Sequence, residues 1–434
     1  MTRDAQMSDE RRETIDASHV SRLASPCVSC LASRAFVGPN WPTHPFEHLF
    51  SEPSRNGFYS PNPTGPISAK IIGMGTLFHS DLVRAVDSQE TNISPTEFDR
   101  FSVRSGDLLF GRRSLVESGA GKVSLVCSLS ESAIFESSLI RVRLNENLAL
   151  PQFYLYFFKS RHGRSIVSSI VTGTNVKGIR SSELSKILVP LPPLSEQRRI
   201  VGILSAYDDL IENNRKRIAL LEESARRLYK EWFIRLRFPG HERVPVEDGV
   251  PKGWSWAPLS EVANVVMGQS PESESYNSEG IGLPFHQGVT GFRFRYPENE
   301  MWCSAGTRFA EAGDILFSVR APVGRINVAK ERIVIGRGLS AMREKTNHQS
   351  WLLYTLKHHF NKEDLIGGGC IFASTTKKEL LSVRLLCPKE ELVARFEEFV
   401  RPIDEQISNL NSQTISLATA RDALLPRLMK GGVG

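Results

Sequence analysis

Cysteine and histidine residues near the start of the sequence have the spacing of a zinc finger. Cys27 and Cys30 form a CxxC pair, and His44 and His48 form an HxxxH pair after a gap of thirteen residues. Thiolate and imidazole groups at such spacings bind Zn²⁺ tetrahedrally. A finger places both histidines on one helix, however, and the three prolines around this segment would break a helix. We therefore expect no metal site and interpret the spacing as incidental.

Motifs for other chemistry are incomplete. Gly119–Lys122 has the glycines and lysine of a phosphate-binding loop, but Val123 follows the lysine and no glycine lies five residues before Gly121. We interpret this run as a β-turn with a basic side chain. No acidic residue is followed two places later by lysine, a pairing common in nucleases, and Asn62–Thr64 lacks the second proline of an amino-methyltransferase loop. The sequence therefore favours a non-catalytic protein.

The composition is that of a folded protein with a slight excess of basic residues. Of 434 residues, 40% are hydrophobic and 24% are charged, which permits several domains with their own cores. No apolar run reaches the ~18 residues of a spanning helix, and the charged N-terminus lacks a signal-peptide core. We expect a cytoplasmic protein with reduced thiols. Its net charge of +6 mildly favours a polyanionic partner. Four cysteines have no ligand spacing and are expected to be buried apolar residues: Cys127, Cys303, Cys370 and Cys387.

An internal repeat organises the sequence. Ser105–Phe110 (SGDLLF) recurs 207 residues later as Ala312–Phe317 (AGDILF). The segment from Gly173 to Trp232 recurs without a gap at an offset of 196 residues. Repetition on this scale indicates two equivalent structural units.

Each copy of the repeat contains a long helix with apolar residues at alternating spacings of three and four. Two such heptad seams predict an antiparallel coiled coil within one chain. The alternatives are two ordinary amphipathic helices or pairing between chains. Polar Asn214, Thr414 and Arg421 either fix the register or lie at solvated edges. The first seam is Leu204, Tyr207, Ile211, Asn214, Ile218, Leu221, Ala225, Leu228 and Trp232. The second is Val400, Ile403, Ile407, Leu410, Thr414, Leu417, Arg421, Leu424 and Leu428.

Helix-breaking residues define the boundaries. Prolines precede Ser195, which can cap the first helix, and Phe238–Gly240 is expected to end it. Pro402 and Pro426 predict a kink or break in the second helix. The predicted organisation is an extension over 1–40, a first domain over 41–193, a central helix over 194–238, a second domain over 239–388 and a distal helix over 389–434.

Both domains are expected to mix α and β structure. The extension has no counterpart in the second copy and is expected either to be disordered or to precede a start at Met7. Short strands are predicted at 106–110, 122–129, 139–143 and 332–335, and helices at 152–159 and 351–360.

The sequence resembles the specificity subunits of type I restriction-modification systems. The resemblance covers roughly residues 41–434 and rests on the two Gly-Asp strands, the run Leu188–Gln197 and the repeated helices. The second copy departs from it at Cys387–Lys389 and at Gly367–Gly369. The resemblance implies that two target-recognition domains each read half of a bipartite double-stranded DNA site, with the helices as a ruler between the halves. It also implies two docked methyltransferase subunits and further restriction subunits. AdoMet, ATP and Mg²⁺ would be bound by these partners, with no cofactor on this chain.

Candidate DNA-reading residues are basic or amide side chains in the predicted loops, because such groups contact base edges and phosphates. On a strand, the alternating run Phe292–Tyr296 would place its arginines on one face, where they either read DNA or are merely solvated. The clusters at 215–217 and 226–227 are expected to form a solvated or partner-docking face. First-domain candidates are Lys70, Arg104, Arg112, Arg113, Lys122, Arg161, Arg164, Lys177 and Arg180. Second-domain candidates are Gln287, Arg293, Arg295, Arg308, Arg320, Arg325, Arg337, Lys377 and Lys378.

Two other functions remain open from the sequence. One is a diverged methyltransferase or nuclease fusion, which activity of the isolated chain with AdoMet or Mg²⁺ would reveal. The other is a coiled-coil scaffold whose domains bind something other than DNA.

Overall fold

The computed structural model describes residues 41–86, 88, 90–360 and 374–430, which form parts of two compact units. The first unit comprises residues up to 207 and from 419 onward, and the second comprises 208–418. Each unit thus contains one domain and a portion of both long helices. The predicted extension over 1–40, the glycines at 367–369 and the cysteines at 27, 30 and 370 lie outside the described residues. No described helix is long and apolar enough to cross a membrane.

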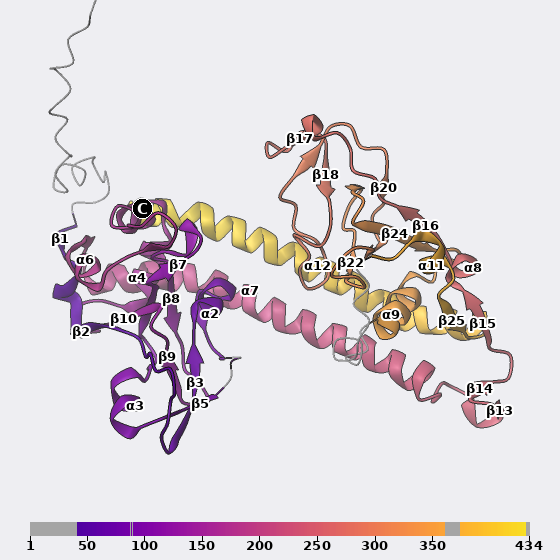
Figure 1. Ribbon diagram of the computed structural model, residues 1–434, viewed down its shortest axis with the longest axis horizontal. Helices are drawn as coiled ribbons and strands as arrows, with labels where there is room; N and C mark the ends of the chain where they lie inside the picture. The colour runs from indigo at the N-terminus through magenta and orange to yellow at the C-terminus, as the bar shows by residue number, and fades with distance from the viewer. Residues whose placement is uncertain (1–40, 87, 89, 361–373, 431–434) are drawn as a thin grey trace, which may run out of the picture. The chain divides into compact units, whose positions relative to one another are not determined.

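The first domain is built on a five-stranded sheet with the order β2-β10-β6-β8-β4. A three-stranded sheet, β5-β3-β9, and the pairs β1-β12 and β11-β7 complete it (Figure 1). Its strands are β1 (Thr43–Pro45), β2 (Phe50–Asn56), β3 (Ile67–Ile72), β4 (Leu82–Val83), β5 (Glu90–Ile93), β6 (Leu108–Gly111), β7 (Arg113–Ser114), β8 (Val123–Val126), β9 (Ala133–Phe135), β10 (Leu139–Leu144), β11 (Lys177–Gly178) and β12 (Leu188–Pro190). Its helices are η1 (Phe46–Leu49), α2 (Met74–His79), α3 (Pro95–Phe101), η2 (Glu117–Gly119), α4 (Pro151–Lys159), α5 (Arg161–Ser168) and α6 (Ser181–Lys186).

The second domain repeats the central sheet as β16-β24-β21-β22 and adds a second sheet, β17-β19-β18-β23-β20. Two strand pairs, β15-β25 and β13-β14, complete it. Its strands are β13 (Val246–Glu247), β14 (Val250–Pro251), β15 (Ser255–Pro258), β16 (Ala263–Met267), β17 (Tyr276–Asn277), β18 (Leu283–His286), β19 (Trp302–Cys303), β20 (Phe309–Ala310), β21 (Ile315–Ser318), β22 (Ile326–Val328), β23 (Ile333–Ile335), β24 (Leu339–Glu344) and β25 (Arg384–Cys387). Its helices are η4 (His241–Arg243), α8 (Leu259–Val262), η5 (Ser273–Ser275), α9 (Gln349–Phe360) and α11 (Lys377–Leu381).

The repeated Gly-Asp motif forms the same turn in both domains. Gly106 and Gly313 adopt φ values of +93° and +87°, which glycine tolerates without steric cost. The next residue, Asp107 or Asp314, accepts a hydrogen bond from the backbone N–H three residues before it. The turn feeds β6 and β21, which are buried along their whole length. The repeat in sequence is therefore a repeat in structure, and the strands and helices predicted in both copies are confirmed at their cores.

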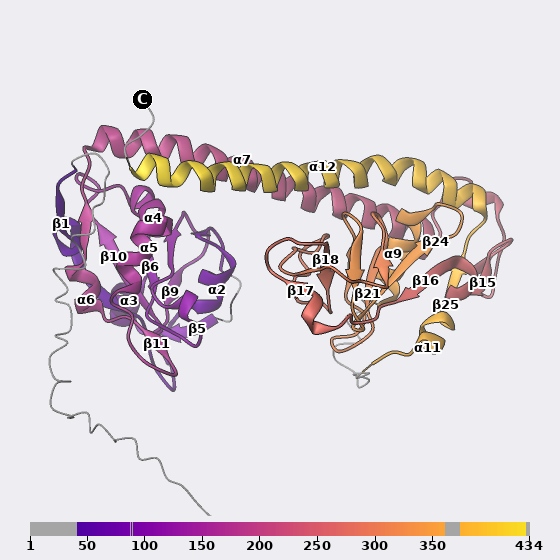
Figure 2. The ribbon, with the colours of Figure 1, turned by 90° about the horizontal axis from the view of Figure 1, so that it is seen from above.

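The two long helices are α7 (Leu194–Tyr229), extended by a π-helical turn η3 (Lys230–Ile234), and α12 (Glu390–Met429). They begin 196 residues apart, as the repeat predicts. In the first unit, Ile200 and Leu204 of α7 share a core with Leu425 and Leu428 from the end of α12. In the second unit, the end of α7 packs against the start of α12. The helices lie side by side and antiparallel within each unit (Figure 2), so the predicted antiparallel pairing within one chain is confirmed.

No predicted seam residue is exposed. Asn214 is buried, whereas Thr414 is half-buried and donates its hydroxyl to the Leu410 carbonyl at 2.8 Å. The basic residues at 215–217 and 226–227 are all exposed, as expected.

Two features of the helices differ from the sequence prediction. The central helix ends at Ile234, because Leu236 adopts a left-handed φ of +58° and turns the chain before Phe238. The distal helix continues without a break through Pro402 and Pro426. Both prolines are exposed, so the backbone carbonyls that lose their N–H partners can bind water instead.

Candidate nucleic-acid interface

In the first domain, the structure gathers three predicted DNA-contact residues at one groove. Strand β7 pairs with β11, placing Gly178 opposite Arg113 and Lys177 opposite Ser114. The groove beside this pair is lined by Arg112, Arg113 and Arg180. It is also lined by groups that can hydrogen-bond to a ligand: Asn56, Thr172, Ser181, Ser182 and Ser185.

The charge in this groove is not neutralised by the protein. Among the described residues, Arg113 forms no ion pair, and Arg112 donates to the neutral Ser137 carbonyl at 3.1 Å. Burial and the adjacent charge of Arg113 lower the pKa of Arg112. Two neighbouring guanidinium groups without a carboxylate create a positive potential that a phosphate oxygen would relieve.

The second domain presents an arginine at the equivalent place. Arg320 follows Arg113 by 207 residues, and its bridge partner Ser374 follows Gly178 by 196. Like Arg113, Arg320 is exposed and has no ion-pair partner in the described part of the chain. The exposed Lys377 and Lys378 begin α11, whose N-terminus is fixed by a capping box. Both domains thus carry cations without a counter-charge at equivalent places, beside the β7–β11 pair in the first domain and at the Arg320–Ser374 bridge in the second.

Several first-domain candidates are already occupied by protein groups. Lys70 pairs with Glu131 at 2.6 Å, and Arg164 donates to the Ser118 carbonyl at 2.5 Å. Lys122 shares Asp81 with Lys159. Burial raises the pKa of Asp81, but the two lysines lower it by a larger amount, so the pKa lies below its usual value. Arg104 and Arg161 are exposed and lie outside the groove lining.

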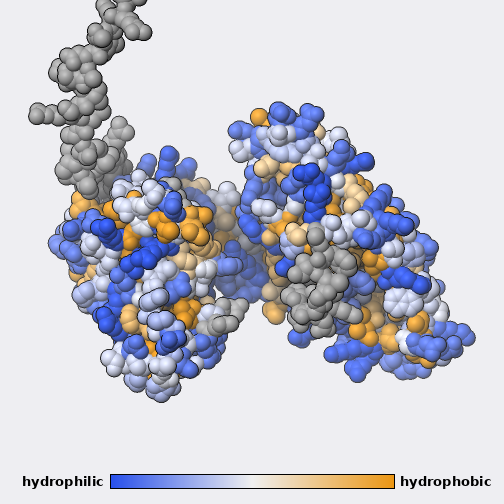
Figure 3. Space-filling view, viewed as in Figure 1, coloured by the Kyte–Doolittle hydropathy of each residue, from blue (hydrophilic) through white to orange (hydrophobic). Residues whose placement is uncertain are grey.

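The remaining second-domain candidates lie on other loops. Gln287 and Arg337 meet at Ser270, whose hydroxyl exchanges hydrogen bonds with the Gln287 amide and accepts the backbone N–H of Arg337. The backbone carbonyl of the exposed Arg308 accepts the N–H of Ile335 on β23. Arg325 lines a separate groove. The visible face of each unit is mostly hydrophilic, with smaller hydrophobic patches (Figure 3).

Two predictions about the run Phe292–Tyr296 are wrong. The run is not a strand but a loop closed by a single bridge between Phe292 and Pro297. Its arginines lie in opposite environments. Arg293 is exposed and pairs with Glu298 at 2.5 Å, whereas the Arg295 side chain is 5% exposed. Arg295 is drawn inward by carboxylates of the long helices and is unavailable to DNA.

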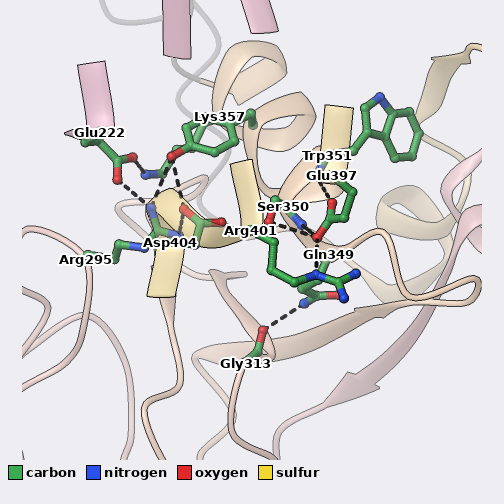
Figure 4. Close-up of polar contacts among 11 residues, drawn as sticks. Glu222, Arg295, Gly313, Gln349, Ser350, Trp351, Lys357, Glu397, Arg401 and Asp404 are labelled. Carbon is green, nitrogen blue, oxygen red and sulfur yellow. Dashed lines mark hydrogen bonds and ion pairs between the residues drawn. The ribbon is translucent and has the colours of Figure 1, made fainter. Parts of the chain in front are cut away.

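A buried ionic cluster surrounds Arg295 (Figure 4). Its Nη1 lies 2.5 Å from Glu222 Oε2 on α7, and its Nη2 lies 2.6 Å from Asp404 Oδ1 on α12. From α9, Lys357 pairs with Glu222, and the Tyr354 hydroxyl lies 3.2 Å from Arg295 Nη1. We call Glu222, Arg295, Tyr354, Lys357 and Asp404 the Arg295 cluster.

Burial and charge act differently on the two carboxylates of the Arg295 cluster. Burial raises the pKa of Glu222, but Arg295 and Lys357 together lower it below its usual value. Burial also raises the pKa of Asp404, and there it outweighs the attraction of Arg295. The sequence search missed these carboxylates. Their signal was an acidic residue directly after the seam residues Leu221 and Ile403.

The motifs considered for metal and phosphate binding have structural explanations. His44 lies on β1 and His48 on η1, with ring centroids 6.2 Å apart, so the two do not share a helix. No cluster of metal-binding side chains occurs within the described ranges. Gly121 adopts a φ of +69° in the turn that precedes β8, as expected for a β-turn. Cys303 is buried, but Cys127 and Cys387 are only half-buried.

Two domains of repeated topology, each followed by a long helix and each presenting cations at an equivalent loop, define a tandem recognition protein. A family model described as "Type I restriction modification DNA specificity domain" matches residues 62–223. A protein of Methanocaldococcus jannaschii, assigned as the specificity subunit of the type I restriction enzyme MjaX, is 29% identical over 87% of this chain and 90% of its own length.

Two further relatives extend the comparison. The specificity subunit of the type I restriction enzyme EcoKI from Escherichia coli is 32% identical over 38% of this chain and 36% of its own length. The crystal structure of a type I restriction-modification S subunit from M. genitalium covers 90% of this chain and 96% of its own, with a TM-score of 0.54 and 18% identity, and supports the fold. Residues 62–223 of this chain thus match the DNA specificity domain of type I restriction-modification systems, and most of the chain is similar to the specificity subunits of these enzymes.

Proposed function

We propose that this chain reads a bipartite double-stranded DNA target, one half with each domain, and positions the catalytic subunits of a type I restriction-modification enzyme on it. The observation that carries the proposal is the equivalence of Arg113 and Arg320, which face solvent without a counter-charge and pair with equivalent backbone positions, Gly178 and Ser374, in two repeated domains. A protein that reads two half-sites needs its contacts presented twice by equivalent surfaces.

The first-domain groove lined by Arg112, Arg113 and Arg180 is better suited to bind DNA than a protein surface. Unpaired guanidinium groups bind phosphates bidentately, and the neighbouring serine, threonine and asparagine side chains can contact phosphate oxygens or base edges. The groove holds three arginines and no carboxylate. We assign Arg112, Arg113 and Arg180 to the first half-site, and Arg320, Lys377 and Lys378 to the second.

The partners follow from the family. We propose that two methyltransferase subunits dock on the α7–α12 pair and that restriction subunits join them, in the cytoplasm. AdoMet, ATP and Mg²⁺ would then bind to those subunits. The exposed basic clusters of α7 at 215–217 and 226–227 are available for such docking.

Co-expression with the methyltransferase subunit of the same system tests the proposal. Sequencing of methylated bases should find adenine methylation within a split motif, and the motif should disappear when this chain is omitted. Methylation that is independent of this chain, or confined to one continuous motif, would refute the proposal. Light scattering of the purified complex should give two methyltransferase subunits per chain.

A further inference from the structure

We propose that Arg295 is a positioning residue for DNA recognition: by bridging both long helices from a loop of the second domain, it fixes the orientation of that domain and so the spacing at which the second half-site is read. The proposal rests on the proposed function and adds to it a specific determinant of spacing.

The contacts of Arg295 come from separate elements of the second unit. The residue lies in the loop between β18 and β19, and its backbone carbonyl accepts the N–H of Val328 on β22. One guanidinium nitrogen contacts α7 through Glu222, and the other contacts α12 through Asp404. One side chain thus connects the sheet of the domain to both helices (Figure 4).

The chemistry of this bridge makes it directional. A guanidinium is planar and donates in fixed directions, so it holds two carboxylates only when both helices keep their places relative to the domain. The pair is also shielded from water, because the Glu222 and Asp404 side chains are 12% and 17% exposed. A slide of either helix by one turn would leave a buried charge unpaired, which is strongly unfavourable. Apolar packing tolerates such shifts more readily, since it is not directional.

The first domain offers no equivalent of this bridge among its described residues. Its contact with the helices includes an apolar core and the amide of Gln197. It does contain a half-buried arginine with two carboxylates: Arg143 contacts Glu52 at 2.9 Å and Asp107 at 2.6 Å. All three of those residues belong to the domain itself, so Arg143 supplies a matched control.

The test uses the full chain in complex with its methyltransferase subunit, and DNAs that carry the methylated motif at its native spacing or one base pair longer or shorter. Arg295→Lys keeps the positive charge but cannot hold both carboxylates with one ammonium group. We expect the ratio of affinities for native over altered spacing to fall about tenfold, comparable with the loss of one base-pair contact. Affinity for the native spacing should change less than this ratio.

A second variant removes the danger of unpaired buried charge. Replacing Arg295 by Met together with Asp404→Asn removes one positive and one negative charge and leaves Glu222 paired with Lys357, and this variant should lose spacing discrimination to a similar degree. Arg143→Lys should lower the melting temperature and leave the ratio unchanged. Equal loss of affinity at every spacing in the Arg295 variants would mean a merely structural role and would overturn the proposal, as would an equal change of ratio in Arg143→Lys. A wild-type complex that binds no split target would instead refute the proposed function, and this inference with it.

Discussion

The two units hold their domains on the same pair of helices by different means. In the first unit, Gln197 of α7 accepts the N–H of Leu150 at the start of α4 and donates to the carbonyls of Leu148 and Pro192. In the second unit, Glu397 of α12 receives the N–H groups of Ser350 and Trp351 at the start of α9. A neutral amide in one unit and a carboxylate in the other thus accept backbone N–H groups at the start of the equivalent helix. With the repeat offset of 196, Gln197 corresponds to position 393, which is four residues, or about one helical turn, before Glu397.

A pair of equivalent lysines shows the same contrast. Lys159 is the ninth residue of α4, and Lys357 is the ninth residue of α9, which begins 198 residues later. Lys159 pairs with Asp81 inside its own domain, whereas Lys357 pairs with Glu222 on α7. The repeated fold therefore places the two lysines at equivalent positions. The partner of each lysine differs, and only in the second unit does this ion pair connect the domain to a long helix.

The largest effect is expected at the apolar centre of the second unit. Phe396 of α12 is fully buried, and its ring contacts those of Trp232, Phe233 and Tyr354. Phe396→Ala should lower the free energy of unfolding by about 3–5 kcal/mol, because it removes buried area and leaves a cavity. Urea denaturation measures this change. The exposed Leu220 gives the control, since Leu220→Ala should change stability by less than about 0.5 kcal/mol; similar losses for both variants would mean that the helix pairing is not centred on Phe396.

DNA binding should respond equally in the two units. Arg113→Gln and Arg320→Gln should each weaken binding of the full complex by about 1–3 kcal/mol and reduce the slope of log affinity against log salt by about one. Titrations at several salt concentrations measure both quantities. Arg332→Gln is a suitable control, because Arg332 is exposed but already pairs with Glu311 at 3.3 Å. A loss confined to one of the two arginines would break the equivalence of the domains.

The smallest effect is a difference in pH dependence. The lowered pKa of Asp81 means that its ion pairs stabilise the fold above the unfolded pKa, and that this stability is lost as pH falls. Burial raises the pKa of Glu397, so its contribution is greatest at low pH and is lost as pH rises through the folded value. Asp81→Asn should therefore differ most from wild type near neutral pH and least in acid. The stability of Glu397→Gln relative to wild type should increase as pH rises from about 4 to 7. Relative to wild type, the unfolding free energy of Asp81→Asn should fall as pH rises from about 2 to 5, whereas that of Glu397→Gln should rise between about pH 4 and 7. Differences from wild type that follow pH in the same direction for both variants would contradict the assignment.

Local patterns made the architecture predictable from the sequence. The Gly-Asp turn requires a glycine with positive φ, and the seam residues of α7 and α12 are all at least partly buried. The repeat offset of 196 residues also predicted the start of α12 from the start of α7. The continuity of α12 through Pro402 was not predictable, because it depends on which helix face meets solvent. The fate of Arg295 was equally hidden, since an arginine between aromatic residues has the same pattern whether it faces solvent or two distant carboxylates.

The central claim, that each domain reads its own half of a split target, is most directly tested by exchanging one domain. Residues 41–193 can be replaced by the corresponding domain of a relative with a different target, leaving α7, the second domain and α12 unchanged. Sequencing of methylated adenine in cells that co-express the methyltransferase subunit should then find one half of the motif replaced and the other half retained. A motif that is unchanged, or altered in both halves, would contradict the account.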